Sequence, residues 1–156
     1  MSGAPPDLLT MIGRLGLALV VGAMVGFERE VEAKPAGFRT LALVSVGSCL
    51  FALLSLDLVH TWQGTANLRL DPIRVVAGLI GGIGFLGAGA IIESRGSVEG
   101  MTTAAGIWVT GATGMACGIG SYWLAVSGAV LALVILRGLG ILERWFARRR
   151  RRGEAR

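Results

Sequence analysis

The sequence predicts an all-α membrane protein, a compact bundle of five transmembrane helices with the N-terminus outside and the C-terminus in the cytoplasm. Of the 156 residues, 53% are hydrophobic and only 16% are charged, a composition too apolar for a soluble globule. Apolar runs about as long as the hydrocarbon core is thick recur along the chain. Most basic residues fall on one side of those runs, as the positive-inside rule describes.

The first two spans are separated by a turn. In the first span Ala18, Gly22 and Gly26 recur at every fourth residue, a stripe of small residues typical of close helix packing. The sequence Pro-Ala-Gly at 35–37 predicts a turn before the second span. The five predicted spans are residues 8–27, 38–58, 72–92, 101–119 and 122–142.

Polar segments separate the remaining spans. Residues 60–71 are expected to form an external loop, and residues 93–100 a short polar link. The fourth span repeats the stripe of small residues with Gly106, Thr110, Gly114 and Gly118. Residues 1–147 are therefore expected to form one transmembrane domain. Residues 148–156 are expected to be a basic cytoplasmic tail, with no soluble domain after it.

The third span is dominated by glycine, with six glycines between Gly78 and Gly89. In water each costs a helix roughly 1 kcal/mol relative to alanine. In a bilayer the backbone must stay hydrogen-bonded, and glycine lets neighbouring backbones come close. Because these glycines occur on every face, we expect the third helix at the centre of the bundle. The alternative topology has four spans, with the third or the fourth segment re-entrant. The predicted packing residues are Gly78, Gly82, Gly84, Gly87, Gly89 and Trp108.

Four motifs carry a family resemblance. They read GFERE at 26–30, KPAGFRT at 34–40, GFLGAGAII at 84–92, and VEGMTTAA at 98–105 followed by Trp108. In this order they resemble the MgtC/SapB family of bacterial inner-membrane proteins, over about residues 8–145. Leu41 and Met101 depart from the family pattern, which often has histidine and leucine there. The resemblance implies a role in adaptation to magnesium limitation and, in pathogens, in survival inside host cells.

The predicted topology places all four motifs at the cytoplasmic ends of helices. Carboxylates at the end of the first helix oppose its macrodipole, whereas the second and fourth helices present positive N-terminal ends at that level. We therefore expect Glu28 or Glu30 to pair with Arg39 or with amides of the fourth helix. A helical wheel places Arg29 and Glu30 near the small-residue stripe and Glu28 on the far side, where headgroups or another protomer would face it. The predicted functional polar ring is Glu28, Arg29, Glu30, Arg39, Thr40, Thr102 and Thr103, with ordinary boundary charges and helix caps as the alternative. The neighbouring charged residues are expected to be ordinary boundary charges; they are Glu32, Lys34, Glu93, Arg95 and Glu99.

The chemistry-bearing residues do not form a catalytic motif. The sequence contains no nucleophile–base pair, no cluster of histidine and cysteine and no phosphate-binding loop, so we expect no enzyme and no cofactor. Cys49 and Cys117 are expected to be buried free thiols at different depths. Mg²⁺ stays open as a ligand, with Glu28 and Glu30 as the metal candidates. The +5 net charge comes mainly from the arginine tail and indicates anionic headgroups rather than nucleic acid as its partner.

Two classes of function follow. The first is a regulator that acts through intramembrane contacts on other inner-membrane proteins, as a homo-oligomer and most simply a dimer. The second is a carrier or channel for Mg²⁺ or protons. Because Mg²⁺ prefers oxygen ligands and carriers bind ions near the midplane, the scarcity of acids inside the spans favours the regulator.

Overall fold

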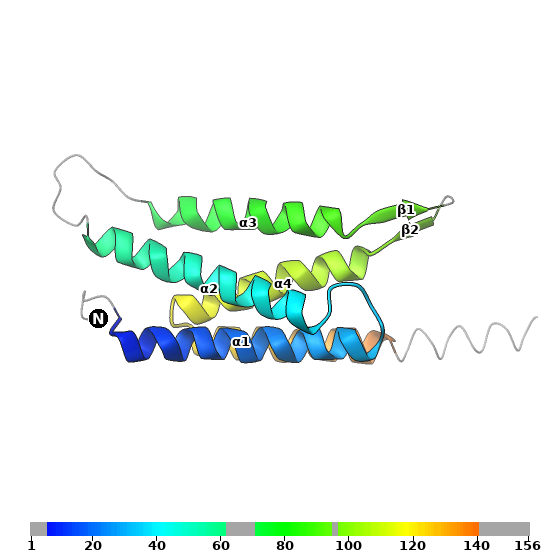
Figure 1. Cartoon of the computed structure of the whole chain (residues 1–156), viewed down its shortest axis with the longest axis horizontal. Helices are drawn as coiled ribbons and strands as arrows, with labels where there is room; N and C mark the ends of the chain where they lie inside the picture. The colour runs from blue at the N-terminus through cyan, green and yellow to red at the C-terminus, as the bar shows by residue number, and fades with distance from the viewer. Residues whose placement is uncertain (1–5, 62–70, 95–96, 141–156) are drawn as a thin grey trace, which may run out of the picture.

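The computed structural model describes residues 6–61, 71–94 and 97–140, and this part of the chain forms five helices and one small hairpin (Figure 1). The mostly helical fold and its five helices confirm the prediction at that level. The elements are α1 (Leu8–Val31), α2 (Phe38–Thr61), α3 (Pro72–Gly89), β1 (Ile92–Ser94), β2 (Ser97–Glu99), α4 (Met101–Gly118), α5 (Tyr122–Val134) and its π-helical continuation η1 (Ile135–Leu139).

Three helices in the described ranges are long and apolar enough to cross a membrane. They are α1, α2 and the continuous segment Tyr122–Leu139, while the apolar part of α3 is shorter. Large apolar side chains such as Phe85 and Trp123 point outward from the bundle. Such a surface suits lipid as the surrounding solvent. That α3 and α4 also cross the bilayer stays a prediction.

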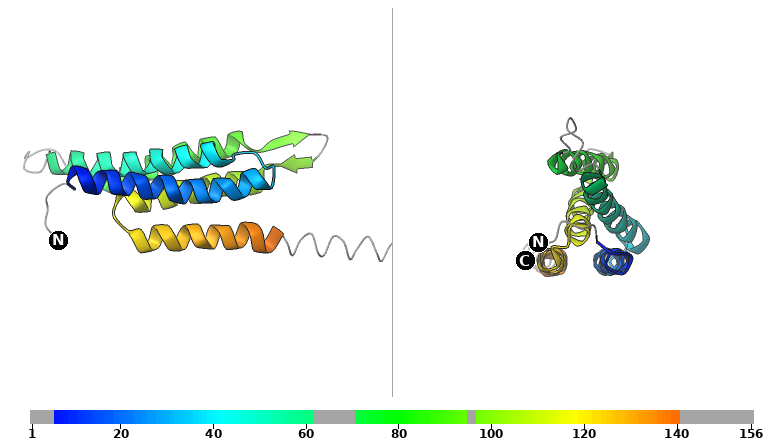
Figure 2. Two further views of the ribbon diagram at one scale, coloured as in Figure 1. Left: turned by 60° about the horizontal axis from the view of Figure 1, so that its bottom comes forward. Right: turned by 90° about the vertical axis from the view of Figure 1, so that its left-hand side faces the viewer.

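The helix at the centre of the bundle is α4 rather than α3. It packs against all four other helices, whereas α3 packs mainly against α2 and α4. The end-on view in Figure 2 shows α4 in the middle and α3 at one edge. Small residues on several faces of α4 allow this: Gly111 faces Ile83 of α3, and Thr113 faces Gly128 of α5.

The prediction that α3 is enclosed by other helices is therefore wrong for the single chain. A side-chain carbon placed on any of four of its predicted packing glycines would meet nothing within 4 Å; these are Gly78, Gly82, Gly84 and Gly89. Gly87 does face α4, at Ala104. Trp108 is 48% exposed instead of being buried against α3. Glycine on every face shows that other helices can approach this helix closely. It does not show which of its faces are packed against other helices of the same chain.

The two stripes of small residues are contact surfaces, and both pack on α2. A side-chain carbon on Gly22 of α1 would lie 2.6 Å from the Ser45 side chain. A side-chain carbon on Gly114 of α4 would collide with the backbone of the same residue, Ser45. Gly118 likewise lies against α2, whereas Gly106 has open space beside it. Ser45 is thus clamped between two glycines, and α1, α2 and α4 form the closely packed part of the molecule.

The two cysteines lie in one buried cluster. Both are free thiols, as expected, but they are not separated in depth. The reason is Gly118, where an added side-chain carbon would lie 2.7 Å from the Cys49 carbonyl oxygen. The missing side chain lets the last turn of α4 lie against the middle of α2, which brings Cys117 to the level of Cys49.

The segment expected as a polar link is a β-hairpin, so the fold is not purely helical. Ile92 pairs with Glu99, and Glu93 pairs with Val98, in antiparallel register. Because β1 begins at Ile92, α3 ends at Gly89, earlier than predicted. Gly100 then starts α4 with φ of 89°, and a side-chain carbon there would collide with the Ala90 carbonyl oxygen. Glycine fits this junction because it adopts positive φ readily and because it has no side-chain carbon to collide with Ala90.

An arginine within α1 binds the C-terminal end of α4. Arg14 Nη1 donates a hydrogen bond of 2.7 Å to the Gly118 carbonyl oxygen, and Arg14 Nε donates one of 3.4 Å to the Tyr122 hydroxyl. The last carbonyls of a helix lack backbone donors and carry partial negative charge. Arg14 therefore caps the C-terminal turn of α4.

Candidate functional site at one end of the bundle

The alternating directions of the helices bring distant motifs together. The C-terminal ends of α1 and α3 lie at the same end of the molecule as the N-terminal ends of α2 and α4, together with the hairpin (Figure 1). We call this the Glu28 end. The predicted polar ring lies here, but its members differ in burial and in partners.

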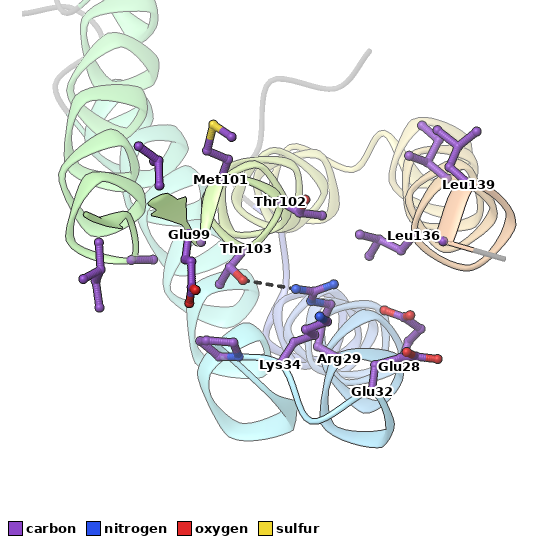
Figure 3. A pocket seen from close by; sticks show the side chains of 17 residues that line it. Glu28, Arg29, Glu32, Lys34, Glu99, Met101, Thr102, Thr103, Leu136 and Leu139 are labelled. Carbon is purple, nitrogen blue, oxygen red and sulfur yellow. Dashed lines mark hydrogen bonds between the residues drawn. The ribbon is translucent and has the colours of Figure 1, made fainter. Parts of the chain in front are cut away.

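Arg29 points inward to α4. Only 5% of Arg29 and 3% of Thr103 is exposed, and Arg29 Nη2 donates a hydrogen bond of 3.1 Å to Thr103 Oγ1 (Figure 3). The helical wheel thus placed Arg29 correctly, on the packed face of α1. Thr102, the neighbour of Thr103, is exposed. The two threonines therefore play different parts, which their shared motif did not indicate.

Glu28 is buried on a different side of α1. It is 4% exposed, and its Oε2 atom has no hydrogen-bond partner among the described residues. The wheel placed it away from the small-residue stripe, where headgroups or another protomer were the expected neighbours. Instead η1 stands on that side, and its Leu136 and Leu139 line the same cavity as Glu28 (Figure 3). A buried polar atom without a partner is costly, so this carboxylate is a candidate for contact with a ligand.

Glu30 binds the start of α2 rather than Arg39. Its Oε2 atom accepts a hydrogen bond of 2.8 Å from the Phe38 amide, the first residue of α2. Amides in the first turn of a helix lack backbone acceptors and carry the positive end of the macrodipole. Gly37 makes room, because a side-chain carbon there would collide with the Glu30 carboxylate.

The two expected pairings, of a carboxylate with Arg39 or with amides of the fourth helix, are therefore not those that the described residues form. Arg39 is exposed, and within the described ranges it forms no hydrogen bond or ion pair with Glu28 or Glu30. Thr40 is exposed as well. The competing interaction was the α2 amide, which is closer in the chain to Glu30 and needs no long side chain to be ordered.

A cavity of about 870 Å³ is lined by four members of the predicted ring, Glu28, Arg29, Thr102 and Thr103, and not by Glu30, Arg39 or Thr40. It lies between the end of α1, the hairpin, the start of α4, and η1 (Figure 3). Figure 3 shows Glu28 and Glu32 on the η1 side, while Arg29 points towards Thr103. The charged residues lining it are Glu28, Arg29, Glu32, Lys34 and Glu99, and the apolar ones include Ile92, Val98, Met101, Ile135, Leu136 and Leu139.

Sequence reasoning treated Glu32, Lys34 and Glu99 as ordinary boundary charges and missed the η1 wall. The spacing of Glu28 and Glu32 was the available signal, because residues four apart share one face of a helix. A π-helical segment has no comparable signal in its sequence, although such segments are frequent at functional sites.

The carboxylates do not converge on one point. In the part of the chain that the structure describes, no group of three or more His, Cys, Asp and Glu side chains is placed to hold a metal. Glu30 is engaged by the Phe38 amide, whereas Glu28 faces η1. The two metal candidates of the sequence thus lie in separate environments.

Three of the described helices are apolar and long enough to span a bilayer, which defines an integral membrane protein. Its charged cavity lies at one end of these helices. Residues 15–145 match the MgtC family. The chain belongs to this family, which confirms the resemblance seen in its motifs.

Curated relatives agree with this assignment. The chain is 41% identical over 123 residues to YhiD of Escherichia coli (strain K12), named as a candidate magnesium transporter, covering 79% of this chain and 57% of YhiD. It is 35% identical over 130 residues to SapB of Bacillus subtilis (strain 168), covering 83% and 55%. It is 36% identical over 116 residues to MgtC of Salmonella typhimurium (strain LT2), covering 74% and 46%. The chain thus spans about half the length of these relatives. No solved structure matches it.

Proposed function

We propose that this protein is a non-enzymatic regulator in the bacterial inner membrane, acting on other membrane proteins during adaptation to low magnesium or to life inside host cells. The link to magnesium is supported by the name of YhiD. We further propose that all five helices cross the bilayer, with the N-terminus outside and the Glu28 end facing the cytoplasm. The basic residues Arg29, Lys34 and Arg39 near that end support this orientation.

The observation that carries the regulatory proposal is the separation between the ionic groups and the packed interior. Within the described helices, acidic side chains occur near helix ends, and the middle of α1, α2 and α4 is closed by contacts such as those of Gly22 and Gly114 with Ser45. Mg²⁺ gives up water reluctantly and wants oxygen ligands. A magnesium ion crossing this interior would meet no carboxylate to replace its hydration shell.

The open face of α3 supports contact with another membrane protein or a second copy of the chain. Gly78, Gly82 and Gly84 have space beside them within the single chain. In a bilayer, exposed glycine favours close approach of another helix, because van der Waals contact between backbones is a main source of helix association. A homo-oligomer, most simply a dimer, is part of the proposal.

Transport assays in liposomes test the regulatory reading. The purified chain is reconstituted, and Mg²⁺ and proton uptake are followed under an imposed gradient. We expect uptake equal to that of empty liposomes. Uptake above that level, abolished by Glu28→Gln and retained by Glu93→Gln, would replace the regulator with a transporter. Glu93 is the matched control because it is an exposed carboxylate at the same end that does not line the cavity.

A carrier or channel is the second candidate, and buried hydroxyl groups favour it. Ser45 Oγ and Thr110 Oγ1 are buried without a hydrogen-bond partner in the described part of the chain. Thr110 and Thr103 lie two helical turns apart on α4, so hydroxyls extend inward from the Arg29 site. If this line conducts protons, Thr110→Val should abolish proton uptake in the same assay.

A further inference from the structure

The cavity at the Glu28 end carries opposite charges on different sides. The Arg29 guanidinium lies towards α4 and donates one hydrogen bond, to Thr103, within the described residues. Guanidinium has five N–H donors, so others stay free for an acceptor in the cavity. The Glu28 carboxylate lies towards η1, and its Oε2 atom has no partner in the described ranges although 96% of the residue is buried. Figure 3 shows Arg29 bonded to Thr103 on the α4 side of the cavity and Glu28 on the η1 side.

The charge pattern restricts the kind of ligand. A simple anion would satisfy Arg29 and Lys34 but leave Glu28 buried without a partner. A metal ion lacks a converging set of carboxylates among the described residues. A ligand with a cationic and an anionic group satisfies both sides, because an ammonium group donates three hydrogen bonds and a phosphate accepts several.

The η1 wall of the cavity, opposite α1, restricts the kind of ligand further. Ile135, Leu136 and Leu139 of η1 present apolar side chains to the cavity beside Glu28. The cavity also lies at the ends of helices that are long enough to span the hydrocarbon core, which is the level of lipid headgroups. A ligand that joins a dipolar head to an acyl chain matches both features.

We propose that this cavity binds a zwitterionic phospholipid with a primary amine, that is, an ethanolamine phospholipid. Its ammonium group binds the Glu28 carboxylate. Its phosphate accepts hydrogen bonds from Arg29 and from Lys34, and an acyl chain lies along η1. The site does not depend on the regulatory function proposed above, because either a regulator or a transporter can hold a bound lipid.

Lipid retention measured by native mass spectrometry tests the proposal. The full chain is purified in mild detergent and incubated with equal amounts of dioleoyl phosphatidylethanolamine and dioleoyl phosphatidylglycerol, which lacks the ammonium group. We expect the wild type to retain the ethanolamine lipid about ten-fold better, the equivalent of one charge-assisted hydrogen bond. Glu28→Gln should abolish the preference, and the matched control Glu93→Gln should keep it. Equal retention of both lipids by the wild type would overturn the proposal, as would an unchanged preference in Glu28→Gln.

Two further measurements distinguish a loss of lipid binding from a loss of folding, and a bound lipid from a bound soluble ligand. Leu139→Trp fills the cavity from its exposed wall without changing a charge, and it should lower ethanolamine-lipid retention several-fold while the unfolding temperature without lipid stays near that of the wild type. Glycerophosphoethanolamine, the headgroup without acyl chains, should fail to displace the lipid at millimolar concentration. Displacement at micromolar concentration would overturn the lipid and identify a soluble dipolar ligand, and full retention by a folded Leu139→Trp variant would exclude this cavity.

Discussion

Adjacent residues of one motif, Thr102 and Thr103, meet opposite environments at the start of α4. Thr103 is buried and accepts a hydrogen bond from the Arg29 guanidinium, whereas Thr102 is exposed. Thr103→Val should lower the free energy of unfolding by about 1.5–3 kcal/mol, because a buried charged donor loses its acceptor. Thr102→Val should stay within about 0.5 kcal/mol of the wild type. Chemical unfolding in a single detergent measures both, and equal losses would contradict the assigned roles.

Gly37 is the second residue whose role depends on a specific neighbour. Gly37→Ala should displace the Glu30 carboxylate from the Phe38 amide and lower stability by about 1 kcal/mol, the usual effect of losing a helix N-terminal acceptor. In a Glu30→Ala background, which has neither the carboxylate nor its hydrogen bond, the same change should have a smaller effect. A double-mutant cycle measures this coupling, and additivity of the two substitutions would show that Gly37 serves another purpose.

At the scale of helices, glycines that look alike in the sequence are used differently. Gly114→Ala should destabilise the protein by about 1–3 kcal/mol, because the new methyl group meets the Ser45 backbone, which cannot move aside. Gly82→Ala should be neutral or stabilising, because its site is open and alanine is the better helix former. Thermal unfolding of the monomeric protein in detergent compares them. A similar loss for both would mean that α3 is enclosed after all.

The helices also explain why the site is assembled where it is. Sequential helices joined by short links run antiparallel, so the end of α1 and the starts of α2 and α4 share one end of the bundle. Centrality of α4 then brings Thr103 to Arg29, and η1 closes the cavity over Glu28. Each of these features of the site depends on which helices are neighbours in the folded chain.

For the whole molecule, the testable property is its orientation in the membrane. We expect the C-terminus in the cytoplasm and residues 62–70 outside. Alkaline phosphatase, which is active only outside the cytoplasm, should be inactive when fused after Arg156 and active when inserted after Gln63. The reverse pattern would place the Glu28 end outside and contradict the positive-inside argument. Activity at both sites would contradict an odd number of crossings between them.

The sequence by itself determined the family, the five helices and the meeting of four motifs at one end. These follow from local composition, from the length of apolar runs and from the alternation that short links impose. The stripes containing Gly22 and Gly114 were also readable, because residues four apart share a helix face. The helical wheel even gave correct directions for Arg29 and Glu28. The predicted basic tail and the boundary at residue 147 lie outside the described residues.

Only the tertiary structure decided which neighbour each side chain meets in the direction in which it points. It placed α4 rather than α3 at the centre, set η1 and a shared cavity beside Glu28 instead of the open bilayer surface, and gave Glu30 the Phe38 amide in place of Arg39. The physical reason is that periodicity along one helix defines where a side chain points relative to its own axis. Burial and pairing depend on the helix that lies in that direction, which is set by contacts between residues far apart in the chain.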